Sequence, residues 1–367
     1  LNVMIGKIDN VSVKEYLGQE VVPDSGCGHW LWEPQSTNLI PYSEDFSDSS
    51  WNTLGTTVVA DAAISPSGLM NGYKVVSNTA NAEHNIRRSI LPTATESISV
   101  FAKQAGWKYF FYRLNLSGVW YNTIFDLEDG VVTLNESGSE YSIEDYGNGW
   151  YRCVLNVANR THNLVQFGIS KHSNSHTSQG DGTSGLFMWG AQLEQNTSYP
   201  TSYIPTNGAT STRLQDIASN SGNSTLINST EGVLYAEIAA LSDDLTLRSI
   251  SLSDGTTNNV ATIRYRTNSN RIQVVVFNGG VLQFSNSFDV TNILDFNKVA
   301  ISYNQSDFNY WVNGVKRANS TSGNTPIGMN KLSFDNGGSH PFYGKTKALA
   351  VWKEALIDSE LQSLTTI

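Results

Sequence analysis

Cysteine, proline, charged residues and long apolar runs are all scarce in this sequence. It holds two cysteines and nine prolines in 367 residues, and charged residues make up only 15%. Two cysteines exclude a disulfide framework; they leave room for one bridge, but we expect Cys27 and Cys153 to be buried thiols. No apolar run is long enough to span a bilayer, and no lysine- or arginine-rich run offers a surface to nucleic acid.

Small polar residues and aromatic residues make up much of the composition in place of charged residues. Ser, Thr, Asn and 30 glycines give a mixture that is poor in helix formers and rich in strand and turn residues. Aromatic residues reach 11%, which argues against intrinsic disorder. The formal net charge of -10 disfavours a nucleic-acid partner, because an acidic surface repels phosphates. We expect neither nucleic-acid binding nor membrane insertion.

Short strand-like runs, separated by turn signals about every 8–12 residues, predict the fold class. We expect an all-β protein with two tandem antiparallel β-sandwich (jelly-roll) domains and a short C-terminal helix. The first domain covers residues 37–205 and the second covers 232–367, with the helix at about Asp358–Leu364. Residues 206–231 are almost all small and polar, which is typical of a linker.

The first 36 residues stand apart from both domains. Ile5–Glu15 alternates like a strand but has no hairpin partner before it, and its pattern matches that of Leu186–Glu194, which closes a domain. We therefore expect residues 1–36 to hold the closing strand of an upstream domain, followed by a connector. A chain that opens with Leu1 also fits a piece of a longer polypeptide.

Several motifs resemble those of known proteins. The first domain carries, in order, motifs of a domain common in bacteriophage and prophage tail proteins: EPQSTNLIPYSEDF at 33–46 with Trp51 after it, NGWYRC at 148–153, WGAQLE at 189–194 and PTSYIP at 200–205. The second domain resembles a concanavalin A-like (laminin-G-like) jelly roll through GVLYAE at 232–237, YWVNG at 310–314 and VWKEAL at 351–356.

This resemblance implies a tail-fibre or virion-surface protein, or a glycan-binding module whose first domain is carbohydrate-binding-module-like. The implied partners are cell-surface or environmental polysaccharide and other virion proteins. Tail fibres are usually trimers, so a homotrimer is expected from the resemblance, although no heptad pattern supports it. The implied location is the virion surface or the extracellular space.

Strand parity points to a candidate sugar-binding face, because alternate residues of a strand lie on opposite sides of its sheet. In five strands between Ser97 and Ser170, one set is apolar and is the predicted core. The opposite set mixes Trp, Arg and amides, which stack on pyranose rings and read their hydroxyls. The predicted carbohydrate-binding residues are Arg113, Asn115, Trp120, Asn122, Trp150, Arg152 and Gln166. The same mixture is typical of a subunit interface, and of a sheet face covered by loops or by the connector.

The second domain offers a comparable set of polar and aromatic side chains. Arg264, Arg266 and Asn313 could read a sugar, whereas Trp311 is assigned to the core, because either Tyr310 or Trp311 must face inward. The Asp-Gly pairs at 181–182 and 254–255 are compatible with a structural calcium ion, but such pairs are far more often turns. No cofactor is predicted, and no Cys/His cluster has the spacing of a zinc site.

Catalytic patterns are missing from the sequence. Glycosidases need two carboxylates about 5–10 Å apart, but Val233–Ala239 contains only Glu237, and Glu128 and Asp129 lie at a turn. There is no nucleophile elbow and no phosphate-binding glycine loop. We therefore predict a non-catalytic virion structural and adhesion protein that recognises surface polysaccharide. The alternative is an extracellular polysaccharide-degrading enzyme or its accessory carbohydrate-binding region.

Overall fold

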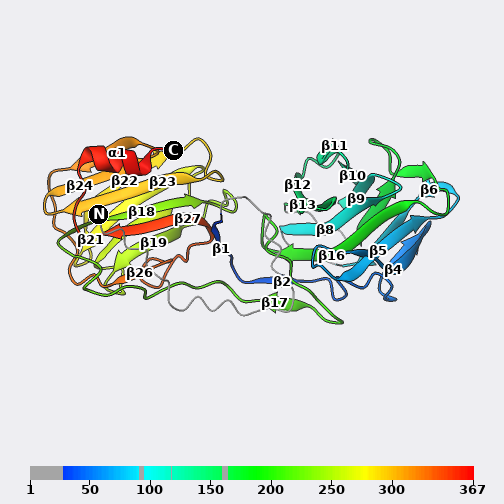
Figure 1. Cartoon of the computed structure of the whole chain (residues 1–367), viewed down its shortest axis with the longest axis horizontal. Helices are drawn as coiled ribbons and strands as arrows, with labels where there is room; N and C mark the ends of the chain where they lie inside the picture. Colours follow the sequence, from blue (N-terminus) through cyan, green and yellow to red (C-terminus); the bar gives the residue numbers. More distant parts are fainter. Residues whose placement is uncertain (1–27, 91–94, 117, 159–163) are drawn as a thin grey trace. The chain divides into compact units, whose positions relative to one another are not determined.

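The computed structural model describes residues 28–90, 95–116, 118–158 and 164–367. Strands account for nearly all of its secondary structure, and the single helix in this part of the chain is α1 (Asp358–Thr365) (Figure 1). Neighbouring strands of every sheet pair antiparallel. The predicted all-β fold class with a short C-terminal helix is confirmed. Cys27 and the predicted strand Ile5–Glu15 lie outside the described residues.

The described residues divide into two compact units. The central unit is residues 35–214, and the C-terminal unit joins residues 28–34 to residues 215–367. Within the described residues the chain therefore passes between the units twice, and the central unit is inserted after β1 (Trp30–Trp32) of the C-terminal unit. The predicted domains, in contrast, follow one another along the chain.

Two six-stranded sheets form most of the described part of the central unit and enclose an aliphatic and aromatic core. The front sheet has the strand order β11-β10-β9-β14-β7-β3, and the back sheet has the order β12-β13-β8-β16-β5-β4. Their strands are β3 (Asn52–Leu54), β4 (Thr56–Ile64), β5 (Met70–Ser77), β7 (Asn85–Ser89), β8 (Glu96–Ala105), β9 (Tyr109–Leu116), β10 (Val119–Asp126), β11 (Val131–Asn135), β12 (Glu140–Asp145), β13 (Trp150–Val157), β14 (Leu164–Ser170) and β16 (Gly185–Gln195).

Alternate residues of these strands point into the core, as the sequence predicts. Tyr121 and Tyr151 pack against the core from partly buried positions. Val119 is an exception at 52% exposure, because it directly follows the hairpin turn at Gly118. Cys153 is a buried free thiol. The other predicted core residues are all buried: Ile98, Val100, Ala102, Phe110, Leu114, Leu116, Phe125, Leu127, Leu155, Val157, Val165, Phe167 and Ile169.

The C-terminal unit also stacks two sheets on a common core. One has the order β1-β27-β18-β23-β24-β25, and the other, here called the serine-rich sheet, has the order β22-β21-β20-β19-β26. The strands are β1 (Trp30–Trp32), β18 (Glu231–Ala239), β19 (Arg248–Ser253), β20 (Val260–Tyr265), β21 (Arg271–Asn278), β22 (Val281–Asp289), β23 (Asn297–Asn304), β24 (Asp307–Val312), β25 (Val315–Ser320), β26 (Lys331–Ser333) and β27 (Gly344–Trp352).

Helix α1 packs on the sheet that contains β23 and β24 (Figure 1). Leu361 is fully buried there against Trp311 and Tyr235, and Leu364 packs beside it. Trp311 is 5% exposed, so its assignment to the core is correct. Asn313 lies in the adjacent hairpin turn, where its side chain accepts a hydrogen bond from the Lys298 backbone N–H (2.9 Å). The Asn313 side chain therefore stabilises the turn.

The connecting segments are tied to the units rather than free. Strand β1, within the predicted connector, pairs with β27 and brings Trp32 into the core of the C-terminal unit, 4.4 Å from the Phe334 ring. Within residues 206–231, β17 (Ser211–Arg213) pairs with β2 (Ser36–Asn38) in the central unit. Ser221 exchanges backbone hydrogen bonds with Leu332 in the C-terminal unit. The small polar side chains of this segment leave the backbone N–H and C=O groups accessible, so these groups can form hydrogen bonds with a neighbouring strand.

Candidate functional site

The structure divides the seven predicted binding residues between two sheets. The outer surfaces of the front and back sheets of the central unit are called here the front face and the back face. Strand parity predicts on which side of a strand a residue lies, but it does not predict which sheet the strand joins. The prediction of a single face is therefore wrong. Arg113, Asn115, Trp120, Asn122 and Gln166 belong to strands of the front sheet, and Trp150 and Arg152 belong to β13 of the back sheet.

The two back-face residues are buried. Trp150 is 2% exposed, and its indole N–H donates to the Ile64 carbonyl at 2.9 Å. Arg152 is 3% exposed, and its Nη2 donates to the Thr201 carbonyl at 2.8 Å. Their cover includes Tyr203, which packs with Phe101 in the same cluster. Neither side chain can contact a ligand at the surface, so both are corrected from binding residues to packing residues, in line with the alternative of a face covered by loops.

A polar row crosses five strands of the front face. Cross-strand partners run from β10 through β9, β14 and β7 to β3, and directly opposed residues lie on the same side of a sheet. The front row, in that order, is Asn122, Arg113, Gln166, Arg87 and Asn52. The next row toward the β9–β10 hairpin pairs Trp120 with Asn115. The front face thus brings five predicted residues together, of which Gln166 (2% exposed) and Asn122 (8% exposed) are buried. It also adds Arg87 and Asn52, which sequence reasoning missed although the parity of Asn85–Ser89 could have shown Arg87.

Among the residues of these rows, Trp120 and Asn52 are exposed, and Arg113 lies partly buried against Trp120. The Arg113 guanidinium carbon lies 5.0 Å from the centroid of the Trp120 ring, within the range of a cation–π contact. On its other side, Arg113 Nη1 lies 3.0 Å from Glu83 Oε1. The ion pair fixes the guanidinium against the indole, while 42% of Trp120 stays exposed. The result is an aromatic platform held at a defined angle above the polar row.

Beneath the platform, several polar atoms are only partly satisfied. The Asn122 backbone N–H and Nδ2 both donate to Glu136 Oε2, at 2.8 and 2.7 Å. Asn85 Nδ2 donates to Gln166 Oε1 at 3.1 Å. Within the described residues, Asn122 Oδ1, Asn85 Oδ1 and Arg113 Nε are buried without a hydrogen-bond partner. A buried polar atom without a partner costs about 1–3 kcal/mol, so these side chains gain from a polar group that reaches them.

A short two-stranded cover closes the far part of the front face. It pairs β6 (Asn81–Glu83) with β15 (Thr177–Gln179), and His176 beside it contacts the Phe111 ring with centroids 6.4 Å apart. Phe111 lies across Gly168, where a Cβ atom would sit 2.0 Å from the ring. Burial, followed by the positive charge of Arg113, lowers the pKa of His176. The accessible part of the face is therefore the region around Trp120, beneath which Asn122 is only 8% exposed.

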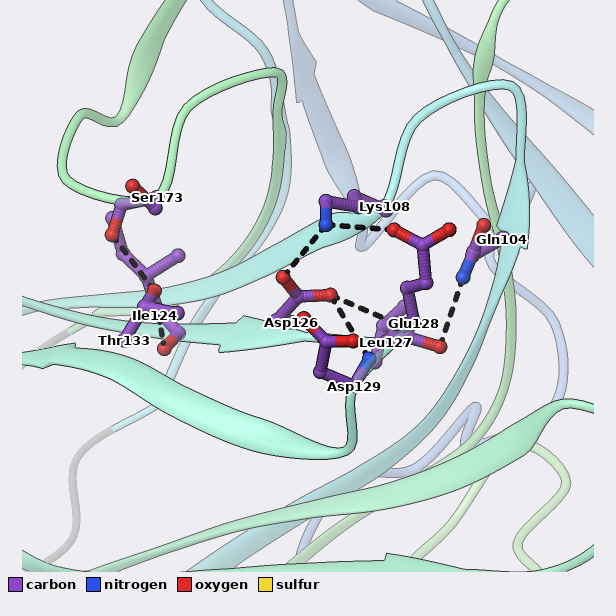
Figure 2. A network of polar contacts seen from close by, with 9 residues as sticks. All are labelled: Gln104, Lys108, Ile124, Asp126, Leu127, Glu128, Asp129, Thr133 and Ser173. Atoms are coloured by element: carbon purple, nitrogen blue, oxygen red, sulfur yellow. Dashed lines mark hydrogen bonds and ion pairs between the residues drawn. The ribbon is translucent and has the colours of Figure 1, made fainter.

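Figure 2 shows a second polar cluster, where β8 leads into β9 and β10 ends. Lys108 Nζ lies 2.9 Å from Asp126 and 2.8 Å from Glu128, so one cation serves two carboxylates. Burial opposes ionisation of Asp126, but hydrogen bonds from Lys108 and from two backbone N–H groups outweigh it and lower its pKa. A carboxyl group that acts as a general acid needs a raised pKa, so Asp126 does not fit that role.

A pocket of about 380 Å³ adjoins this cluster. Its lining includes Trp107 and Lys171, whose ammonium group lies 5.2 Å from the centroid of the indole ring. The remaining lining residues are Gln104, Gly106, Lys108, Tyr109, Asp181 and Ser184. The volume suits a single small ring, but polar side chains dominate the lining, unlike most ligand pockets.

The two Asp-Gly pairs are turns. Asp181 Oδ1 accepts hydrogen bonds from the backbone N–H groups of Thr183 (2.9 Å) and Ser184 (2.7 Å), which lower its pKa. Asp254 Oδ1 accepts one from the Thr256 backbone N–H at 2.8 Å. Among the described residues, no group of three or more His, Cys, Asp or Glu side chains could hold a metal ion. The helix in this part of the chain is too short to cross a membrane.

No protein-family model matches the sequence, and no curated protein matches it. Solved structures with a similar fold include a leech intramolecular trans-sialidase in complex with 2,7-anhydro-Neu5Ac (18% identity, TM-score 0.33, 38% of this chain and 24% of that chain). A heptameric SAP-like pentraxin from Limulus polyphemus has 10% identity and a TM-score of 0.32, over 40% of this chain and 74% of its own. Domains LG4-5 of the mouse laminin α1 chain have 10% identity and a TM-score of 0.28, over 92% and 96%. At these values no functional residue is carried over from them.

Proposed function

We propose that the protein is a carbohydrate-binding protein whose front face, centred on Trp120, recognises a surface polysaccharide without cleaving it. The observation that carries this proposal is the exposed indole held above a row of amide and guanidinium groups. Aromatic rings stack on the apolar face of a pyranose, and planar amides and arginine forks read its hydroxyls. Both elements lie on neighbouring strands of one sheet, about 4.8 Å apart.

The arrangement of charges on this face favours a sugar over a protein strand or a nucleic acid. Arg113 is paired with Glu83, and Asn122, which is only 8% exposed, is held by the exposed Glu136, so an amide, an ion pair and one exposed carboxylate surround the aromatic ring. Uncharged hydroxyl-rich ligands pair with such groups without a large desolvation cost. In the described part of the chain, Asn122 Oδ1 and Arg113 Nε lack a hydrogen-bond partner, so a ligand hydroxyl that reaches them gains a hydrogen bond.

The test is a glycan array probed with the full chain and with two tryptophan variants. Trp120→Ala removes the platform and is expected to weaken binding about tenfold or more, as for other central aromatic anchors. Trp30→Ala is the matched control, because Trp30 is 48% exposed in the C-terminal unit. Unchanged binding by the Trp120 variant, or an equal loss in both variants, would reject the front face as the binding site.

The finer assignment that we propose is an adhesion protein at the virion surface or in the extracellular space, in contact with other virion proteins. Its support is the resemblance of the motifs at 33–46, 148–153, 189–194 and 200–205 to phage tail proteins. A homotrimer is part of this proposal, and light scattering of the purified chain measures it. A stable monomer that mass spectrometry does not find on any particle would contradict the assignment.

The proposal also requires that bound polysaccharide stays intact. Incubation with a panel of bacterial and marine polysaccharides, followed by assays for new reducing ends and unsaturated products, is expected to give none. Product formation that disappears in Asp126→Asn or Glu128→Gln would replace the adhesion role with a polysaccharide-degrading activity at the cluster in Figure 2.

A further inference from the structure

The serine-rich sheet of the C-terminal unit carries its own polar row. Cross-strand pairing aligns Ser249, Arg264, Gln273 and Ser287 on β19, β20, β21 and β22. Alternate residues of the same strands, such as Ile263, lie in the core, so this row faces away from it. Sequence parity singled out Arg264, and the structure supplies its neighbours.

Arg264 has a neutral partner, whereas Arg248 and Arg271 of the same sheet each pair with an acid. Its Nε donates to Gln273 Oε1 at 2.8 Å, and Gln273 Nε2 donates onward to Ser285 Oγ at 2.9 Å. Within the described residues, neither Arg264 nor Arg266 forms an ion pair with a carboxylate. Ser249 Oγ, directly opposite Arg264, is buried without a hydrogen-bond partner in the same part of the chain.

Neighbouring arginines show how different this environment is. Arg271, on the same sheet, places Nη2 2.8 Å from Asp289 Oδ2, and Arg248 places Nη2 3.1 Å from Asp244 Oδ2. Arg266 lies two residues after Arg264, and its backbone N–H donates to the Arg271 carbonyl at 3.1 Å, which continues the pairing of β20 with β21 and places both arginines on the same side of the sheet. Burial, followed by the charge of Arg266, lowers the pKa of Arg264. A partly buried cation beside another cation is unfavourable, and an anion that contacts both relieves the repulsion.

We propose that Arg264 and Arg266 form a second binding site, which takes an acidic group of a polysaccharide, either a sulfate ester or a uronate carboxylate. A guanidinium fork matches the paired oxygens of both groups. Gln273 and the exposed Ser287 continue the row and supply hydrogen bonds to neighbouring hydroxyls. The chain carries a net charge of -10, so attraction arises only near this local pair of cations.

The experiment compares charged and neutral forms of the same polymers. Affinity electrophoresis of the full chain at low salt uses polygalacturonate against its methyl ester, and a sulfated galactan against unsulfated agarose. We expect retention by at least one acidic polymer, with less retention by its neutral form, and a decline as salt screens the contact. The acid that retains the chain identifies the group. Equal retention by acidic and neutral forms would overturn the proposal.

Arg264→Gln and its matched control Lys316→Gln each remove one positive charge from the same unit, and Lys316 lies on β25 of the other sheet. Loss of a charge-assisted contact is expected to weaken acidic-polymer binding about tenfold in Arg264→Gln, and less than about twofold in Lys316→Gln. Equal effects in both would mean unspecific attraction and would reject the site. Circular dichroism confirms that both variants fold. Trp120→Ala should keep acidic-polymer binding, which separates this site from the front face of the central unit.

Discussion

The front and back faces of the central unit carry the same kinds of residue and use them differently. Each face places an arginine against an aromatic ring, Arg113 against Trp120 and Arg152 against Phe101. On the front face the aromatic ring is 42% exposed, whereas on the back face Phe101 is fully buried. A Trp–Arg pattern therefore indicates that a sheet face is aromatic and polar. Whether the face is accessible to a ligand or buried depends on whether another segment of the chain covers it.

The cover of the back face explains the difference. After β16, the chain returns over the sheet, and Glu194 fastens it through hydrogen bonds from the Thr201 backbone (2.9 Å) and hydroxyl (2.5 Å). Thr201 in turn gives its carbonyl to Arg152. The accessible region of the front face has Trp120 at its surface instead, with the cover near His176 ending at Phe111.

The largest effect that tests this comparison is expected from Trp150→Ala. Removing a fully packed indole should lower the free energy of unfolding by about 3–5 kcal/mol, because the cavity cannot be filled by its neighbours. Chemical denaturation measures this loss. Glycan binding by the folded variant should stay within about twofold of the parent. A loss of less than about 1 kcal/mol, or a selective loss of binding, would return Trp150 to the list of ligand contacts.

An intermediate effect is expected from Glu194→Gln. The carboxylate is fully buried and accepts hydrogen bonds from Ser36 Oγ, Gln192 Nε2 and Thr201, and an amide would place a donor where only acceptors fit. We expect a loss of about 2 kcal/mol in the free energy of unfolding.

Hydrogen exchange should report the same change locally, with faster exchange at the Thr201 amide. Glu128→Gln, an exposed carboxylate of the same unit, is the control and should change stability by less than about 0.5 kcal/mol. Equal effects of the two variants would mean that Glu194 does not fasten the cover.

The smallest effect concerns the pH dependence of the front-face cover. The pKa of His176 is lowered in the folded protein, so the unfolded chain binds a proton more readily. Stability that is complete above the unfolded pKa of about 6.5 is therefore lost as the pH falls below it. His176→Gln should lose less stability than the parent between about pH 7 and pH 5 in thermal melts. Parallel curves for the two proteins would show that His176 does not contribute.

Much of the fold follows from local pattern. Alternation along five strands predicts the core, since every apolar residue assigned to it is buried or packs against it, apart from Val119 at a hairpin end. The final helix is predicted because Leu361 and Leu364 give it one apolar face. These features depend on neighbours a few residues away, which a single sequence displays directly.

The candidate site is harder to predict because it depends on contacts that are distant in sequence. Glu83 reaches Arg113 from β6, and Glu136 reaches Asn122 from beyond β11. Strand β13 pairs with β8 of the back sheet and not with β9 of the front sheet. Trp150 and Trp120 therefore lie on different sheets and not side by side on one face. Parity, which repeats every two residues, contains no information about either choice.

The chain crosses from the C-terminal unit to the central unit after residue 34 and returns after residue 214, so in the part of the chain that the structure describes the central unit is one continuous inserted segment. The Glu33 backbone N–H donates to Asp216 Oδ2 at 2.8 Å, and the Asp216 backbone N–H donates to the Glu33 carbonyl at 2.9 Å. The chain therefore leaves and re-enters the C-terminal unit at neighbouring points. The ends of the central unit are joined in the same way by the pairing of Ser36–Asn38 with Ser211–Arg213. Within the described residues, the central unit is thus inserted into the chain of the C-terminal unit between Pro34 and Gln215, so that β1 and the core of the C-terminal unit lie outside the inserted segment.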